Sequence, residues 1–333
     1  MCCSSPSALA SRGALWRSAG SGKKPLLSLS LIFPGQGSQA IGMGRTLAAS
    51  HARAAAVLAM ADEVLEFPLT RLMTEGPEDE LTATKNAQPA ILAHSVAVLR
   101  VVEDEIGPVA FAAGHSLGEF SAHVAAGTLR YEDALAVVRL RGELMFAAGQ
   151  ERPGTMAAVL GLSDEEVEVV CAEVDVGICV PANFNASGQV VISGDLAGVE
   201  QGMERAQAAG ARRVVLLNVS GAFHSPLMAP AVGALQAELD SVDFQDPAYP
   251  VLSNVTGGPV TSGSQARELL VKQLTSPVRW SASVAAMVDA GTDRFLEIGP
   301  GSVLRGLNRR IARRVPCSSI GELEDLASIA EGA

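Results

Sequence analysis

Aromatic and basic residues are both scarce in this chain of 333 residues. Phe, Trp and Tyr make up 4% of it, too few for the aromatic stacking platforms that bind single-stranded nucleic acid. Lys and Arg number 25 against 36 Asp and Glu, and the net charge of −11 opposes binding to a phosphate backbone. Both deficits exclude nucleic acids as the expected partner and favour small-molecule chemistry.

Cysteine pairs and long apolar runs are also lacking. The cysteines are Cys2, Cys3, Cys171, Cys179 and Cys317. They form no C-x-x-C pair, and no histidine lies at metal-ligand spacing, so we expect a reducing compartment, no zinc site and no disulfide framework. Gly, Pro or charged residues interrupt every apolar run before about 18 residues, so we expect a soluble protein with no membrane span. A hydrophobic content of 48% still supplies core for one or two domains.

Residues 1–28 differ in composition from the rest of the chain. They are rich in Ser, Ala and Gly, contain basic residues and lack acidic ones. This composition fits either an organelle transit peptide or an upstream extension of a bacterial-type chain that starts near Leu26. We expect a cytoplasmic protein in the bacterial case, and a plastid or mitochondrial protein in the other.

Beyond residue 28, apolar runs and breakers predict alternating strands and helices. Strands are predicted at 26–33, 109–113, 251–254 and 294–298, and helices at 45–65, 88–102, 117–126, 266–274 and 281–290. Because strands that alternate with helices form parallel sheets covered on both faces, we expect an α/β domain.

The pattern changes after residue 152. Strands are predicted at 155–160, 178–183, 189–193 and 213–219, and helices at 163–174 and 196–209, the first opened by a capping box at Ser163. The order β-α-β-β-α-β is that of a ferredoxin-like unit. We expect it to be inserted between two parts of the larger α/β domain.

Residues 114–118 read GHSLG, a G-x-S-x-G motif between a predicted strand and a predicted helix. This context is typical of a nucleophile elbow, in which a sharp turn exposes the serine and the helix N-terminus faces the developing oxyanion. The alternative is a glycine-rich turn in which Ser116 only caps the helix. The strand-turn-helix context favours Ser116 as a nucleophile.

The loop at 33–40 reads FPGQGSQA. Its glycine spacing fits a dinucleotide fingerprint, but that fingerprint needs a second strand ending in an acid about 20 residues later, and residues 54–60 read as helix. In an elbow fold, the first loop can instead supply an oxyanion donor. Gln36 and its neighbours are candidates, and the pattern does not choose among them.

A serine hydroxyl needs a base, for which histidine is the usual side chain. His224 is the best candidate, because it lies late in chain order on a loop rich in breakers. The other histidines are His51, His94, His115 and His123. We expect the His115 side chain to point away from Ser116 across the turn.

Arg141 lies on a predicted apolar helix after the elbow. It is either a solvated side chain, as we expect for Arg139, or a bidentate clamp for a substrate carboxylate. Its position alone does not decide. We expect residues 299–301 to form a strand-to-helix turn, because they lack the G-K-[ST] ending of a phosphate loop.

Six ordered motifs together resemble the malonyl-CoA:acyl carrier protein transacylase family over residues 29–310. They are 33–39 (FPGQGSQ), 114–119 (GHSLGE), 141–142 (RG), 221–225 (GAFHS), 273–280 (QLTSPVRW) and 297–301 (EIGPG). The resemblance implies an α/β-hydrolase-like catalytic subdomain at 29–152 and 223–315, a ferredoxin-like subdomain at 153–222 and a C-terminal tail at 316–333.

The resemblance also implies residue roles. Ser116 corresponds to the acylated nucleophile and His224 to the general acid and base, and the backbone N–H groups of Gln36 and Leu117 correspond to the oxyanion hole. Gln273 corresponds to the residue whose backbone carbonyl orients the histidine. Arg141 corresponds to the ligand of the malonyl carboxylate, and Asn183 and Asn185 correspond to residues lining the cleft. The Phe223-His224 pair resembles malonyl-selective rather than methylmalonyl-selective enzymes.

The implied reaction transfers malonyl from malonyl-CoA to the phosphopantetheine thiol of acyl carrier protein through a malonyl-serine, for fatty-acid elongation. It implies no cofactor and no metal, and we expect a monomer. The alternatives are a thioesterase or esterase, a non-catalytic carrier-docking protein, and an acyltransferase of polyketide synthesis. Candidates for a basic docking patch are Arg212, Arg213, Lys272, Arg279 and Arg305.

Overall fold

The computed structural model describes residues 28–326 and contains two β-sheets. The larger sheet has the order β10-β9-β1-β2-β7-β8, formed by β10 (Cys317–Ile320), β9 (Arg294–Ile298), β1 (Leu29–Phe33), β2 (Val109–Gly114), β7 (Val251–Leu252) and β8 (Pro259–Val260). All pairs in it are parallel except β7 with β8. The expected α/β class with a largely parallel sheet is confirmed.

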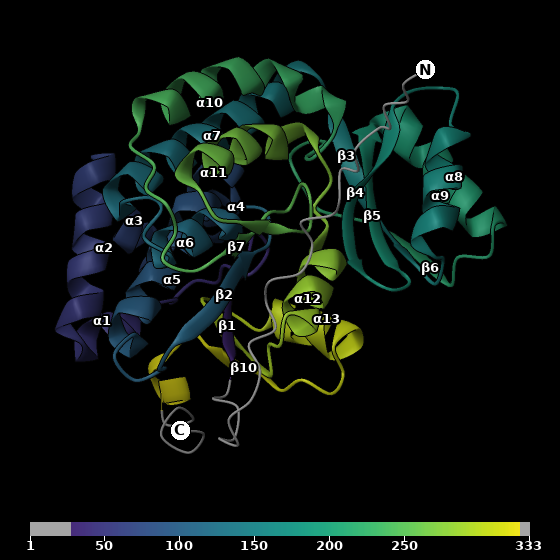
Figure 1. Cartoon of the computed structure of the whole chain (residues 1–333). Coiled ribbons are helices and arrows are strands. Elements are labelled where there is room, and N and C mark those ends of the chain that lie inside the picture. The colour runs from purple at the N-terminus through teal and green to yellow at the C-terminus, as the bar shows by residue number, and fades with distance from the viewer. Residues whose placement is uncertain (1–27, 327–333) are drawn as a thin grey trace, which may run out of the picture.

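Helices cover both faces of this sheet (Figure 1). They are α1 (Arg45–Ser50), α2 (Ala52–Leu65), α3 (Leu69–Glu75), α4 (Glu78–Thr82), α5 (Thr84–Val102), α6 (Gly118–Ala125), α7 (Tyr131–Glu151), α10 (Ala229–Ser241), α11 (Gly263–Lys272), α12 (Trp280–Asp289) and α13 (Val303–Ile311). Strand β1 shows why: Leu31 and Phe33 join the core beneath α5, α6 and α7, whereas Ile32 joins the core beneath α12 and α13. A strand buried on both faces needs apolar side chains in both directions.

The smaller sheet is antiparallel, with the order β4-β5-β3-β6. Its elements are β3 (Gly154–Leu160), α8 (Asp164–Ala172), β4 (Cys179–Ala186), β5 (Gln189–Asp195), α9 (Leu196–Ala208) and β6 (Arg213–Leu216). Helices α8 and α9 lie on the side of the sheet that faces away from the larger subdomain (Figure 1). The element order predicted for this region is therefore present, and Ser163 and Glu166 form the expected capping box.

A backbone bridge joins the smaller sheet to the larger subdomain. Phe184 of β4 donates its N–H to the Val278 carbonyl at 2.8 Å, and Val278 donates to Ala182 at 2.8 Å. These bonds place β4 of the smaller subdomain beside the segment that precedes α12. Three short 3-10 helices, η1 (Pro226–Met228), η2 (Gln273–Thr275) and η3 (Leu323–Leu326), complete the fold.

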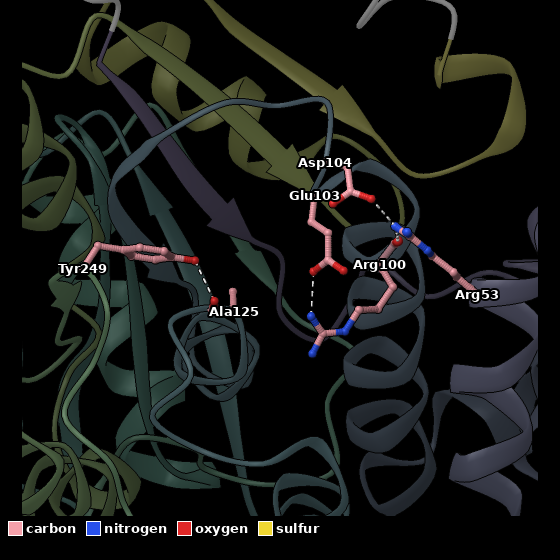
Figure 2. Close-up of polar contacts among 6 residues, drawn as sticks. All are labelled: Arg53, Arg100, Glu103, Asp104, Ala125 and Tyr249. Carbon is pink, nitrogen blue, oxygen red and sulfur yellow. Dashed lines mark hydrogen bonds and ion pairs between the residues drawn. The ribbon is translucent and has the colours of Figure 1, made fainter.

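Polar contacts hold the end of α5, shown in Figure 2. Arg100 pairs with Glu103 at 2.6 Å, and Arg53 of α2 pairs with Asp104 at 2.6 Å. Such exposed pairs contribute little to stability. The Tyr249 hydroxyl donates to the Ala125 carbonyl at 2.7 Å and ties the segment before β7 to the end of α6.

The structure differs from the sequence-based expectations in several elements. The helix expected at 45–65 is divided into α1 and α2, because His51 has extended backbone angles. The expected tail at 316–333 is wrong for β10, whose polar sequence CSSI gave no strand pattern but which pairs in parallel with β9. Helices α3, α4 and α10 and strand β8 were not predicted. The leader expected at 1–28 lies, apart from Ser28, outside the described residues. None of the helices in the described residues is long and apolar enough for a bilayer crossing.

Candidate active site

The turn at Ser116 has the geometry of a nucleophile elbow. Strand β2 ends at Gly114, helix α6 begins at Gly118, and Ser116 between them has φ 51°. A Cβ atom at Gly114 would lie 1.8 Å from the Gly118 carbonyl carbon, and one at Gly118 would lie 2.1 Å from the Phe33 carbonyl oxygen. Both motif glycines are therefore required by close backbone approach.

Asn254, which follows β7, holds this turn from the side. Its Oδ1 accepts the Ser116 backbone N–H at 2.7 Å, and its Nδ2 donates to the Gly114 carbonyl at 2.7 Å. Asn254 is not predictable from the sequence, because nothing in the local pattern links it to a turn 138 residues earlier. Parallel pairing of β2 with β7 brings them together.

His224 lies against the nucleophile. Its Nε2 is 2.8 Å from Ser116 Oγ, and its Nδ1 is 2.9 Å from the Gln273 backbone carbonyl. Because a carbonyl only accepts, Nδ1 carries the proton, and Nε2 is free to accept the serine proton. The structure thus brings together Ser116, His224 and Gln273 as the sequence analysis expected, and the histidine needs no carboxylate partner.

The His224 imidazole is neutral at ordinary pH. Burial, and to a smaller extent the nearby Arg141 charge, lower its pKa to about 3, against the opposing hydrogen bond to Gln273. The residue is 4% exposed. A neutral ring is the form that can act as a base, so the site is ready to deprotonate Ser116 without a prior proton loss.

Arg141 projects from α7 into the same site. Its Nη2 donates to Ser116 Oγ at 3.2 Å and to Gln273 Oε1 at 2.9 Å, and its Nη1 donates to Gln88 Oε1 at 2.5 Å. The residue is 1% exposed, which excludes a solvated role. Burial lowers its pKa to about 10, an effect that Glu119 opposes, so the guanidinium remains charged near neutral pH. Arg139 instead pairs with Glu143 at 2.6 Å.

Two backbone N–H groups are available as oxyanion donors. Gln36 and Leu117 line the cavity that contains Ser116, and neither backbone N–H has an acceptor within residues 28–326. The Gln36 side chain donates to Thr84 Oγ1 at 3.1 Å and so anchors its loop. Pre-positioned N–H groups without competing acceptors can bind a developing negative charge.

The cavity has a volume of about 240 Å³ and lies between the subdomains. Ser116, Arg141 and His224 line it from the larger subdomain, and Met156 and Asn183 line it from the smaller one. Contributions from both sides explain why no single stretch of sequence describes the site.

His115 is also among the residues that line the cavity containing Ser116. The ring Nε2 lies 2.8 Å from Asn185 Oδ1, and the ring centroid lies 5.8 Å from that of Trp280. Asn185 thus reaches the cavity wall through His115. Partners on β4 and α12, both distant in sequence, set this orientation.

The remaining histidines do not line the cavity. His51 separates α1 from α2, and His94 is buried 3.4 Å from Glu322. His123 is buried, and neither of its ring nitrogens has a partner in the described part of the chain. Gln88 and Glu119 were not predicted as site residues, although a carboxylate within the apolar helix α6 is a signal that points to Glu119.

The fold and the site define an acyltransferase. A family model described as the acyl transferase domain matches residues 30–324, and the chain therefore belongs to that family. The resemblance expected from the motifs is confirmed by curated relatives named malonyl CoA-acyl carrier protein transacylase. That of Bacillus subtilis (strain 168) is 44% identical over 300 residues, covering 90% of this chain and 95% of the relative. That of Escherichia coli (strain K12) is 41% identical over 308 residues, covering 92% and 100%.

Solved structures of similar proteins carry the same kind of name as these relatives. An acyl carrier protein S-malonyltransferase from Vibrio cholerae is 39% identical with a TM-score of 0.87, covering 91% of this chain and 99% of that one. A malonyl-transacylase in complex with a type II polyketide synthase acyl-carrier protein (PlMCAT:AntF) is 40% identical with a TM-score of 0.89, covering 92% and 100%. Both likenesses extend over both subdomains.

Proposed function

We propose that this chain transfers the malonyl group from malonyl-CoA to the phosphopantetheine thiol of an acyl carrier protein, through a malonyl ester of Ser116. The observation that carries the proposal is the position of the Arg141 guanidinium, 3.2 Å from Ser116 Oγ and almost fully buried. A buried cation beside a nucleophile suits an acyl group that ends in a free carboxylate. The names of the relatives supply the same substrate and carrier.

The first half-reaction loads the serine. Ser116 Oγ attacks the thioester carbonyl while His224 Nε2 takes its proton, and the N–H groups of Gln36 and Leu117 bind the oxyanion. The C–S bond then breaks, and His224 returns the proton to the CoA sulfur. The product is malonyl-Ser116 and free CoA.

The second half-reaction reverses these steps with a different thiol. His224 takes the proton of the carrier thiol, whose sulfur attacks the ester carbonyl, and the oxyanion is bound by the same two N–H groups. The C–O bond breaks and Ser116 Oγ regains a proton from His224. No cofactor or metal is needed, because the acyl group arrives already activated as a thioester.

Arg141 holds the substrate carboxylate in both half-reactions. Without substrate, its donors are occupied by the Gln88 and Gln273 amides and by Ser116 Oγ. A carboxylate is a stronger acceptor than a neutral oxygen, and the planar guanidinium can bind its two oxygens together. Malonyl is therefore favoured over acetyl, which offers no charge to this side chain.

The wider setting is also part of the proposal. We take the chain to act as a monomer in the cytoplasm, a location supported by the bacterial source of the relatives named above. Its carrier belongs either to fatty-acid synthesis, as the sequence analysis expects, or to polyketide synthesis, as in one structural neighbour. The two kinds of carrier make the same chemical demands on the site.

A direct assay separates this proposal from its alternatives. Purified chain is mixed with malonyl-CoA and a phosphopantetheinylated carrier protein, and malonyl-carrier and free malonate are quantified by mass spectrometry. The proposal requires malonyl-carrier to accumulate in a Ser116-dependent way. Free malonate as the main product would indicate a thioesterase, and equal activity in Ser116→Ala would exclude this serine.

A further inference from the structure

Glu119 lies beneath the nucleophile in the first turn of α6 and has 0% exposure. Its Oε2 accepts from Gln273 Nε2 at 2.6 Å and from the Asn254 backbone N–H at 3.2 Å, whereas its Oε1 has no hydrogen-bond partner in the described residues. Burying a carboxylate is costly unless charge or hydrogen bonds compensate it. The proposed reaction gives this group no chemical step, so its presence calls for another explanation.

Both partners of Glu119 hold reacting groups. Asn254 accepts the Ser116 N–H, as described above. Gln273 bonds through its backbone carbonyl to His224 Nδ1 and through its side-chain Oε1 to Arg141 Nη2. The Glu119 carboxylate is therefore linked, through one intervening residue in each case, to Ser116, His224 and Arg141.

The charge on Glu119 also fixes the orientation of the Gln273 amide. An arginine can only donate and an ionised carboxylate can only accept, so Oε1 must face Arg141 and Nε2 must face Glu119. The same Nε2 also lies 3.0 Å from the Ser116 carbonyl. Without the carboxylate, Nε2 would keep the Ser116 carbonyl but lose its shortest hydrogen bond and its only charged acceptor among the described residues.

We propose that Glu119 is a positioning residue, which holds Ser116, His224 and Arg141 in register through Gln273 and Asn254 and balances the Arg141 charge while the acyl site is empty. This inference rests on the roles proposed above for those three residues. It assigns to the last residue of the GHSLGE motif a function distinct from those of the serine and the glycines.

The titratable groups around Glu119 make the idea testable by pH. Burial lowers the pKa of His115, His123 and His224, so these rings are neutral near pH 7 and Arg141 is the cation among the groups facing the network. Burial raises the pKa of Glu119 to about 7, and its hydrogen bonds and Arg141 limit the rise. Once protonated, the carboxyl becomes a donor and a weaker acceptor, so the network loosens as pH falls.

The test uses a fluorophosphonate probe, which reacts with activated serines and carries no malonyl carboxylate. The rate of Ser116 labelling in the full chain is measured by intact mass for Glu119→Ala and Glu119→Gln. We expect a fall of about tenfold or more for alanine and a smaller fall for glutamine, which can still accept hydrogen bonds but lacks the charge. Rates equal to that of the unmodified chain in both variants would overturn the inference.

Glu297 provides a matched control. It is also fully buried, and it accepts from the Leu304 and Arg305 N–H groups at 2.9 Å each, but it does not line the cavity. Glu297→Gln should label at an unchanged rate per folded molecule, even if its unfolding midpoint falls. A similar loss of labelling in Glu297→Gln would mean that any buried carboxylate has this effect, and would also overturn the inference.

The pH dependence of the Ser116 labelling rate in the unmodified chain tests the role of Glu119 even if the variants do not fold. Labelling should decline below about pH 7 as Glu119 gains its proton, whereas protonation of His224 alone would leave it flat to much lower pH. A rate that stays flat from about pH 8 to about pH 5 would count against Glu119. Failure of malonyl transfer with normal labelling would instead overturn only the proposed substrate.

Discussion

Ser116 and His224 form a 2.8 Å hydrogen bond, and both have left-handed backbone angles, φ 51° and φ 57°. L-residues seldom adopt this conformation, which costs roughly 1–2 kcal/mol per residue. Among the described residues, the only other non-glycine residue with positive φ is Glu66, at the end of α2. Backbone strain thus coincides with the two residues for which we propose proton exchange, and the surrounding packing must maintain it.

Replacing Ser116 should separate strain from chemistry. Ser116→Ala keeps a Cβ atom and hence the strain, whereas Ser116→Gly removes it. We expect the glycine variant to be more stable than the alanine variant by about 1 kcal/mol, with both inactive. Urea unfolding of the two proteins measures the difference. A glycine variant less stable than the alanine variant would show that the turn is not strained at this position.

The covalent intermediate should be visible by mass. Incubation with malonyl-CoA should add one malonyl group to the intact chain and none to Ser116→Ala, because Ser116 is the side chain bonded to His224. Ser121, on helix α6 after the turn, is buried without a hydrogen-bond partner among the described residues, so Ser121→Ala is a matched control that should still be labelled. A stable adduct on Ser116→Ala would place the nucleophile elsewhere.

Arg141 should control acyl specificity more than the rate of chemistry. Its expected partner is the free malonyl carboxylate, and a hydrogen bond to a charged group is worth about 1.5–3 kcal/mol. Arg141→Ala should therefore lose most malonyl transfer while keeping or gaining reaction with acetyl-CoA, and Arg141→Lys should recover only part. The measurement is kcat/KM of each variant for malonyl-CoA and for acetyl-CoA. An equal loss for malonyl and acetyl would make the residue structural.

His123 should weaken the protein in acid. Burial lowers its pKa from 6.5 to about 3, so below pH 6.5 the unfolded chain binds a proton that the folded chain does not. The free energy of unfolding should then fall by about 1.4 kcal/mol per pH unit from this residue, down to about pH 3. His123→Phe removes the group, so its stability relative to the unmodified chain should rise by that amount as pH falls. Chemical unfolding at several pH values tests the slope, and parallel pH profiles would contradict it.

Carrier docking should depend on local positive charge, because the enzyme as a whole is acidic. Of the expected basic candidates, Arg279 is exposed and lines a hollow that also contains His224, whereas Lys272 pairs with Glu268 at 2.5 Å. We expect Arg279→Glu to slow malonyl transfer to the carrier protein but not to a small thiol. Transfer to the carrier should also weaken as salt rises past about 0.15 M.

Arg53 offers the control for this experiment. It is exposed on α2 and pairs with Asp104 (Figure 2). Arg53→Glu changes the net charge by the same amount as Arg279→Glu, but it should leave carrier transfer unchanged. Equal effects of the two substitutions, or rates that do not depend on salt, would argue against a local docking patch.

The sequence by itself determined the features that depend on local spacing. The glycines of the GHSLG motif are required by contacts within one strand-turn-helix unit and with β1, so the motif predicts the elbow. The alternation of apolar runs likewise predicted the parallel sheet, and the capping box at Ser163 predicted the start of α8. Strand β10 was not predicted from the sequence, because a polar edge strand has no apolar pattern.

Only the tertiary structure decided which distant side chains meet. The direction of Arg141 could not be read from its helix, because α7 has polar residues on more than one face, and contacts with Gln88 and Gln273 fix it. The orientation of the His115 ring depends on Asn185, and the support from Asn254 and Glu119 depends on the pairing of β2 with β7. These contacts join residues 53 to 154 positions apart in the chain, and no local pattern encodes them.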